Sequence, residues 1–262
     1  MRVRCRDIEV AWSEWGRGEP LLLVHGLGED RRSWRKLLPW LALRRCVLAY
    51  DLRGHGETSL GDAEGTLRQL SDDLVALLDA LGLERVDLCG FSLGGTVALR
   101  TAIDRPDRVR ALLPVATSSR VGRAAAAWYE ERARLADAGP DRLHPVLCRD
   151  TRDQLAGAPW ELEDHWLVRR EATGDPRGFA AACRALIGLH RHPLDPELAD
   201  IRARTLVVSA ERDPLCPPGA GEALAAAIPD ARLEVVEGSG HHIPLERPEA
   251  LSALILRFLE SG

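Results

Sequence analysis

A serine between glycines offers the clearest chemistry in this sequence. Ser92 lies in the segment GFSLG at residues 90–94, which matches the pattern G-x-S-x-G. The bare pattern arises easily by chance, but here it stands between an apolar run at residues 86–89 and a helix-like segment. In such a strand–turn–helix the serine occupies a sharp turn with its hydroxyl exposed. We therefore predict that Ser92 is a nucleophile; the alternative is a serine that only caps a glycine-rich helix.

A serine hydroxyl is a weak nucleophile that needs a base, which a carboxylate must in turn orient. Asp213 follows an apolar run at residues 205–209, and His241 follows another at residues 233–236, in a glycine-rich loop. The chain order Ser, Asp, His is the order expected for this kind of turn. Because the carboxyl ends of parallel strands share one edge of a sheet, we predict that Ser92, Asp213 and His241 meet there.

Neighbouring residues provide alternatives for the acid and the base. Glu211 lies two residues before Asp213, and His242 directly follows His241. We favour Asp213 and His241 as the catalytic pair, although Asp213 could instead cap the helix that follows it. His242 is interpreted as a hydrogen-bonded supporting residue, and His25 as a structural one.

A tetrahedral intermediate also needs two N–H donors for its oxyanion. One donor belongs to the residue after the nucleophile and the other to the loop after an earlier strand. By position these are the backbone N–H groups of Leu93 and of Leu27, which lies in the segment HGLG at residues 25–28. HGLG could also open a dinucleotide fingerprint, but the sixth position is Arg31 where glycine is required. The residues therefore predict acyl transfer to water without a cofactor.

The cysteines and histidines give little support for a metal site. The six cysteines are scattered without a C-x-x-C pair, and His190 and His192 have no acidic or thiol partner at usable spacing. We therefore expect no metal, and six free thiols in a reducing compartment, the cytoplasm.

Short apolar runs alternate with helical periodicity along most of the chain. Continuous runs are typical of parallel strands buried on both faces, and they occur at residues 21–25, 46–50, 86–89, 111–116, 205–209 and 233–236. Residues 3–15 alternate like an antiparallel edge pair. Pro114 weakens its strand, Thr66 is expected to cap a helix that ends before Gly82, and Pro248 to open another. The pattern predicts an α/β fold with a mostly parallel, doubly wound sheet.

The alternation stops in the middle of the chain. Residues 119–195 are rich in Ala, Arg and Trp and have helical rather than strand patterning. We predict a single domain, residues 1–262, with its core at residues 1–118 and 196–262 and a helical cap of about residues 119–195 inserted after the sixth strand.

These motifs together resemble the α/β-hydrolase superfamily over nearly the whole chain. HGLG, DLRGHGET, GFSLGG, ERDP and GSGHHIPLERPE occur in the order of that family. The cap segments SSRVGRAAAAWYEERA and GDPRGFAAACRAL are most similar to 3-oxoadipate enol-lactonase-like esterases and lactonases. The resemblance implies an α/β-hydrolase fold and hydrolysis of a small-molecule carboxylic ester or lactone. In the cap, Trp128 is expected as an apolar wall, while Arg132 either faces a substrate carboxylate or lies on a solvated helix face.

Other functions remain open for the same residues. Carbon–carbon bond hydrolysis and cofactor-free perhydrolysis would use the same three side chains, and a ligand receptor would keep only the pocket. The formal net charge of −5 argues against nucleic acid as a partner. No apolar run approaches the roughly 20 residues that span a bilayer, so no membrane partner is expected. The sequence leaves monomer or homodimer undecided.

Overall fold

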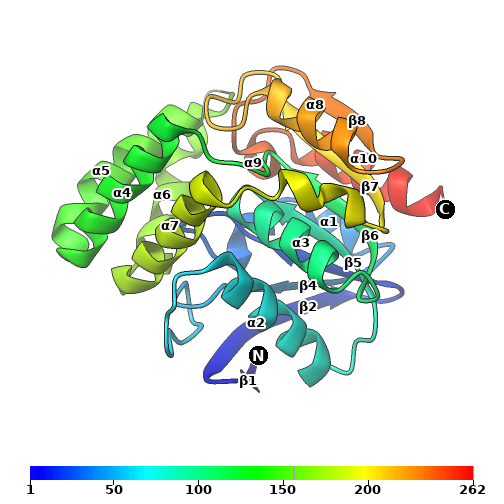
Figure 1. Ribbon diagram of the computed structural model, residues 1–262, viewed down its shortest axis with the longest axis horizontal. Helices are drawn as coiled ribbons and strands as arrows, with labels where there is room; N and C mark the ends of the chain where they lie inside the picture. The colour runs from blue at the N-terminus through cyan, green and yellow to red at the C-terminus, as the bar shows by residue number, and fades with distance from the viewer. Residues whose placement is uncertain (156, 262) are drawn as a thin grey trace.

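One eight-stranded sheet forms the centre of the structure (Figure 1). The computed structural model describes residues 1–155 and 157–261. The strand order is β1-β2-β4-β3-β5-β6-β7-β8; β2 runs antiparallel to β1 and β4, and the remaining neighbours are parallel. The strands are β1 (Arg2–Cys5), β2 (Ile8–Gly16), β3 (Pro20–Val24), β4 (Cys46–Tyr50), β5 (Val86–Phe91), β6 (Val109–Val115), β7 (Arg204–Ala210) and β8 (Arg232–Val236). The predicted parallel sheet with an antiparallel edge is confirmed.

Strand β3 shows why the apolar runs are continuous. Leu22 and Val24 belong to one buried apolar cluster, which includes residues of α2 (Leu67–Ala80) and α3 (Leu93–Asp104). Leu21 and Leu23 belong to a second cluster, which includes residues of α1 (Leu38–Leu41) and α10 (Pro248–Glu260). Successive side chains of a strand point to opposite faces of the sheet. Because helices cover both faces, none of these four side chains faces solvent, and all of them are apolar. Helices α8 (Pro218–Ala227) and α9 (Ile243–Glu246) complete the layers.

Pro114 lies in a central strand in spite of its missing N–H. It pairs with Gly90 of β5, whereas the ladder between β6 and β7 joins residues 111, 112 and 115 to β7 and passes over Pro114. The strand tolerates the proline because the interruption is confined to one of its two ladders. The helix signals also hold: the Thr66 hydroxyl accepts the Gln69 N–H at 3.1 Å, and α10 begins at Pro248.

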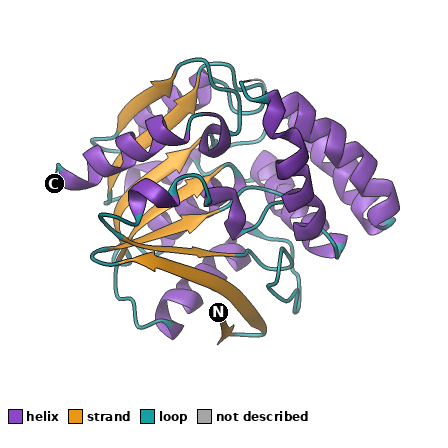
Figure 2. Cartoon of the chain, turned by 180° about the vertical axis from the view of Figure 1, so that it is seen from behind, coloured by secondary structure: helices purple, strands orange, loops and turns teal. Residues whose placement is uncertain are grey.

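Four α-helices between β6 and β7 leave the sheet and gather at one end of it (Figure 2). They are α4 (Arg123–Asp137), α5 (Pro140–Gln154), α6 (Leu162–Ala172) and α7 (Pro176–Arg191), and we call them the helical insertion. They have an apolar cluster of their own, which includes Leu143, Leu147 and Phe179. The position of this insertion, after the sixth strand, agrees with the sequence prediction. No helix within residues 1–155 and 157–261 is long and apolar enough to cross a membrane.

Candidate active site

Ser92 occupies a strained turn between β5 and α3. Its backbone angles are φ 52° and ψ −118°, a region that side-chain-bearing residues avoid. The turn is held by β6, because the Ser92 N–H donates to the Val115 carbonyl at 2.9 Å. The Thr117 hydroxyl in turn donates to the Ser92 carbonyl at 2.7 Å. The hydroxyl of Ser92 is therefore fixed at the carboxyl end of the sheet.

The glycines around Ser92 are required by close packing of the backbone. A Cβ at Gly90 would collide with the carbonyl of Gly94, and a Cβ at Gly94 would collide with the carbonyl of Val24 in β3. A Cβ at Gly95 would lie 2.7 Å from the Thr117 side chain. The motif thus reports the close approach of α3 to the sheet.

Ser92, His241 and Asp213 form one continuous chain of hydrogen bonds. His241 Nε2 lies 3.0 Å from Ser92 Oγ, and His241 Nδ1 lies 2.7 Å from Asp213 Oδ2. The side chains of Asp213 and His241 are 0% and 3% exposed. The other carboxylate oxygen of Asp213 accepts the N–H groups of Leu215 and Cys216 at 2.8 and 2.9 Å. These bonds fix the carboxylate, so its second oxygen faces the imidazole.

The alternatives for acid and base lie elsewhere. Glu211 is half exposed and accepts the Gly238 N–H at 2.8 Å. His242 is buried, with its Nε2 3.1 Å from Gln154 Oε1 and its Nδ1 3.2 Å from Glu29 Oε1. Burial lowers the pKa of His242 to about 3, so its ring is neutral at ordinary pH.

His25 orients the first of the two predicted oxyanion donors. Its Nδ1 lies 2.8 Å from the Gly26 carbonyl, and its Nε2 accepts the Leu52 N–H at 2.9 Å. The C=O and N–H of a trans peptide point in opposite directions, so holding the Gly26 carbonyl turns the Leu27 N–H the other way. Leu93 begins α3, where an N–H has no intrahelical acceptor. Within the described part of the chain neither N–H meets a protein acceptor.

Two cavities meet at Ser92, and both are bounded by the helical insertion. The small chamber, of about 20 Å³, is lined by Leu27, Glu29, Phe91, Ser92, Trp128, Tyr129, Gln154, Arg169, Leu215, His241 and His242. The large chamber, of about 230 Å³, shares Ser92, Tyr129 and Leu215 with it. Its other walls combine apolar and polar side chains, and they include Val121, Ala125, Leu186, Leu189, Pro217, Ala220, Thr96, Thr117, Ser118 and Arg120. Ser92 therefore lies where the two chambers adjoin.

The two cap residues singled out in the sequence have different surroundings. Trp128 lines the small chamber, where a wall was expected. The idea that Arg132 faces a substrate carboxylate does not agree with the geometry. Its Nε and one terminal nitrogen donate to Asp150 at 3.0 and 2.8 Å, and its guanidinium stacks on the Trp128 ring at 4.3 Å. The packing of α4 on α5 brings Asp150 close to Arg132, so this arginine is already paired with a carboxylate of the protein.

A buried arginine that the sequence motifs did not predict reaches the segment after β3, residues 25–32, which we call the Leu27 loop. Arg169 on α6 donates to the Leu27 carbonyl at 3.1 Å. Its other terminal nitrogen donates to Thr151 Oγ1 at 3.0 Å and to Gln154 Oε1 at 3.2 Å. Nothing in the local sequence distinguishes Arg169 from the many other arginines, since only the packing of the insertion places it here.

Glu29, His165 and His242 have the spacing of a metal site, with their candidate ligand atoms within 4.8 Å of one another. His165 Nε2 and His242 Nδ1 each lie 3.2 Å from the same Glu29 oxygen. Burial raises the pKa of Glu29, but the contacts with the two histidines outweigh it and hold the pKa well below its usual range. The guanidinium of Arg169 acts on His165 as a nearby positive charge, which disfavours a cation. One oxygen of Glu29 thus lies close to both histidines, and the cluster is described by these contacts.

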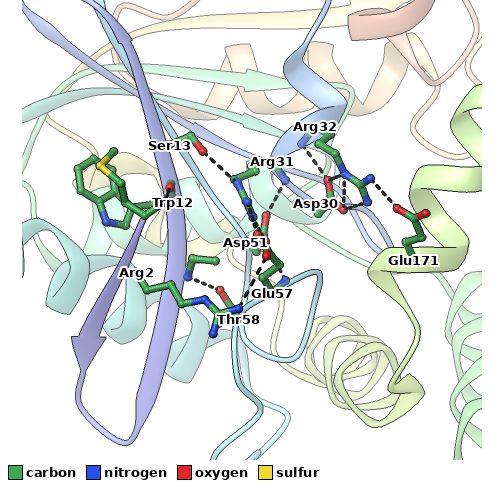
Figure 3. Close-up of polar contacts among 12 residues, drawn as sticks. Arg2, Trp12, Ser13, Asp30, Arg31, Arg32, Asp51, Glu57, Thr58 and Glu171 are labelled. Atoms are coloured by element: carbon green, nitrogen blue, oxygen red, sulfur yellow. Dashed lines mark hydrogen bonds and ion pairs between the residues drawn. The ribbon is translucent and has the colours of Figure 1, made fainter.

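The segment after Leu27 is tied both to the core and to the insertion (Figure 3). The Arg31 N–H donates to Asp51 Oδ1 at 2.8 Å, and its guanidinium pairs with the same carboxylate. Arg32 reaches the other way, to Glu171 on α6, at 2.6 Å. The Leu27 loop is thus positioned by residues from both parts of the molecule.

Comparison with known proteins identifies the family of this chain. Residues 21–254 match the model of the alpha/beta hydrolase family. An acetyltransferase component of the acetoin cleaving system of Pseudomonas putida is 34% identical over 95% of this chain, which spans 66% of that relative. A protein of Azorhizobium caulinodans, provisionally named a carbamate hydrolase, is 28% identical over 96% of this chain and 95% of its own.

A solved structure extends the comparison to three dimensions. The crystal structure of the enol-lactonase from Burkholderia xenovorans superimposes with a TM-score of 0.91, at 26% identity and with both chains fully covered. Fold, motif order and family match agree over nearly the whole length. The chain therefore belongs to the alpha/beta hydrolase family, and this membership supports a hydrolase activity.

Proposed function

We propose that this hydrolase cleaves a carboxylic ester or lactone of a small molecule through an acyl-enzyme on Ser92. The observation that carries the proposal is the hydrogen-bonded chain from Ser92 through His241 to Asp213, at 3.0 and 2.7 Å, on a strained turn. A hydroxyl within hydrogen-bonding distance of an imidazole, which a buried carboxylate orients, is the arrangement that activates a serine.

The reaction proceeds in two balanced halves. Ser92 Oγ bonds to the substrate carbonyl while His241 Nε2 takes the hydroxyl proton, and Asp213 holds the Nδ1–H side of the ring. The N–H groups of Leu27 and Leu93 hold the oxyanion, each contributing roughly 3–4 kcal/mol to the transition state. The carbon–oxygen bond then breaks, and the leaving alkoxide takes the proton from His241. Water then attacks the acyl carbonyl while His241 takes a proton from it. The bond to Ser92 Oγ breaks, His241 returns the proton to that oxygen, and the acid leaves.

The names of relatives support this substrate class. The enol-lactonase opens a cyclic ester, and a carbamate differs from an ester at one atom beside the carbonyl. The helical insertion is proposed as a cap that encloses the substrate, because its residues line both chambers beside Ser92. A cytoplasmic location is supported by six cysteines that are all free in the described chain.

A substrate panel tests the proposal. Ethyl esters, γ- and δ-lactones and an aryl carbamate are offered to the wild type and to Ser92→Ala, with a vinylogous diketone and with hydrogen peroxide as acyl acceptor in parallel arms. We expect turnover of an ester or lactone, and a loss of kcat by roughly 10⁴-fold or more in the variant. Exclusive cleavage of the diketone, or full activity of Ser92→Ala, would overturn the proposal.

A further inference from the structure

Glu246 is a buried carboxylate that follows His241 closely in the sequence, at the end of the short helix α9. It is only 6% exposed, and it lines neither of the two chambers. The guanidinium of the neighbouring Arg247 donates instead to the backbone carbonyls of Gly238 and Glu246, both at 2.8 Å. A buried carboxylate is costly unless donors satisfy it, so the donors that it meets indicate what it holds in place.

One oxygen of Glu246 joins two segments that are far apart in the sequence. Its Oε2 accepts the N–H of Gly240 and the N–H of Gly157, each at 2.7 Å. Gly240 directly precedes His241 in residues 237–242, which we call the His241 loop, and Gly157 lies between α5 and α6 of the helical insertion. Hydrogen bonds to a carboxylate are roughly twice as strong as neutral ones, so this oxygen links the His241 loop firmly to the insertion.

The contact at Gly157 leaves no room for a side chain. A Cβ there would collide with Glu246 Oε2 and would lie 2.8 Å from the carbonyl oxygen of Gly238. Both of these groups belong to the end of the chain that carries His241. The glycine therefore reports a close approach of the insertion to the His241 loop.

The peptide between Ser239 and Gly240, one residue before His241, is held on both sides. Its carbonyl accepts the Arg212 N–H at 2.9 Å, and its N–H donates to Glu246. Because a peptide group is planar, bonds at its two edges fix the orientation of the whole plane. The glycines of the loop allow many backbone conformations, so these bonds supply the restraint that the loop itself lacks.

A small displacement of this loop would reach the reacting groups. The ring of His241 has to meet Ser92 Oγ at 3.0 Å and Asp213 Oδ2 at 2.7 Å at the same time. A misplacement of about 1 Å in such an arrangement can cost about 100-fold in rate.

We propose that Glu246 is a positioning residue that couples the helical insertion to the catalytic base. With Gly157 bound to its carboxylate, the His241 loop keeps the imidazole where it takes the proton of Ser92. Loss of this contact lowers the rate of the chemical step even though no residue that lines the chambers has changed. This inference rests on the proposed roles of Ser92 and His241 in hydrolysis.

Substitutions on both sides of the contact test the coupling. Glu246→Ala removes the carboxylate, whereas Glu246→Gln keeps an amide oxygen that can accept both N–H groups. Gly157→Ala retains the carboxylate and disturbs the contact from the insertion. The matched controls are Glu249→Gln, at an exposed position of α10, and Gly219→Ala in α8, where a Cβ meets nothing within 4 Å. The values of kcat and KM are measured on one ester, well below the unfolding temperature of each variant.

We expect Glu246→Ala to lower kcat by about 100-fold and to change KM by less than about 3-fold, because Glu246 does not touch the substrate. Glu246→Gln should recover most of that loss, and Gly157→Ala should lower kcat by about 10-fold. The double variant should lose less than the product of the two single losses, since both substitutions act on one contact. The two controls should stay within about 2-fold of the wild type.

A wild-type kcat in Glu246→Ala, an equal change in KM, or losses that multiply in the double variant would overturn the coupling. If Glu246→Ala does not fold, Gly157→Ala decides the matter, because a wild-type kcat in that variant contradicts the proposal as well.

Failure of the proposed function gives a different result, since the wild type would then hydrolyse no ester or lactone. In that case proton NMR still tests the position of the His241 ring. The proton between His241 Nδ1 and Asp213 should give a downfield resonance that is absent in Asp213→Asn. This resonance should shift or broaden in Glu246→Ala and persist in Glu246→Gln, and an unchanged resonance in Glu246→Ala would contradict the positioning role.

Discussion

At the scale of single residues, two carboxylates close in sequence have different surroundings. Asp213 is buried, with one oxygen on two backbone N–H groups and the other on His241. Glu211 is half exposed and faces a loop N–H of Gly238. The spacing in the sequence allowed either residue, and three-dimensional packing alone separates them. The surroundings of these two carboxylates, rather than their functional group, therefore decide which of them can orient His241.

Exchange of each carboxylate for its amide tests that separation. Asp213→Asn should lower kcat about 10⁴-fold, because the amide favours the wrong tautomer of His241. Glu211→Gln is the matched control and should stay within about 2-fold, as expected for an exposed carboxylate. Steady-state kinetics on one ester checks both, and comparable losses in the two variants would contradict the assignment.

Stability should depend on pH through His55, whose ring is 1% exposed. Burial lowers its pKa to about 4, and the neighbouring His25 adds to this effect. In the unfolded chain the His55 ring has a pKa near 6.5 and takes up a proton below that pH, whereas in the folded protein it stays neutral until lower pH. Stability is therefore lost as the pH falls below about 6.5. Between pH 7 and pH 5 this one residue should account for about 2 kcal/mol.

Urea unfolding at the two pH values measures this contribution. The free energy of unfolding of the wild type should fall by about 2 kcal/mol more than that of His55→Gln, which has no ring to protonate. Parallel losses in the two proteins would show that other groups carry the pH dependence.

At the scale of elements, strands and turns are predictable from the sequence where a local pattern has a single physical cause. Continuous apolar runs predicted the parallel strands, since the sheet is covered on both faces. The glycines around Ser92 predicted the turn, because α3 approaches β3 too closely for any Cβ at Gly94. The partners of Arg132 and Arg169 could not be predicted, because they depend on how α4, α5 and α6 pack together. That packing joins residues far apart in the chain.

Two glycine substitutions compare the crowded turn at Ser92 with an uncrowded position in a helix. Gly94→Ala should destabilise the protein by about 3 kcal/mol or more, because the methyl group collides with the Val24 carbonyl. Gly188→Ala in α7, where a Cβ meets nothing within 4 Å, should stabilise it by about 0.5–1 kcal/mol. Thermal unfolding measures both, and a Gly94→Ala protein as stable as the wild type would contradict the account of the turn.

At the scale of the whole molecule, the two chambers beside Ser92 are lined both by the sheet core and by the helical insertion. The Ser92 turn forms the floor of the large chamber, and α4 and α7 supply Ala125, Leu186 and Leu189 to its walls. The Leu27 loop is likewise held from both sides, by Asp51 in the core and by Arg169 and Glu171 in the insertion. Substrate size should therefore be set by contacts that no single motif contains.

Filling the large chamber tests this dependence. Ala125→Trp should lower the ratio of kcat/KM for ethyl hexanoate to that for ethyl acetate by about 10-fold or more, since a large side chain occupies the space of the longer acyl group. Ala124 is equally exposed but does not line the chamber, so Ala124→Trp should leave the ratio unchanged. Equal effects of the two substitutions would show that the chamber does not hold the substrate.

The most direct test of the central claim is to identify the residue that becomes covalently modified. The wild type is treated with a fluorophosphonate and digested, and the peptide that contains Ser92 is examined by mass spectrometry. The account predicts one adduct, on Ser92, formed much faster in the wild type than in His241→Ala, because the imidazole removes the hydroxyl proton. An adduct on another residue, or an unmodified Ser92 in the active wild type, would contradict it.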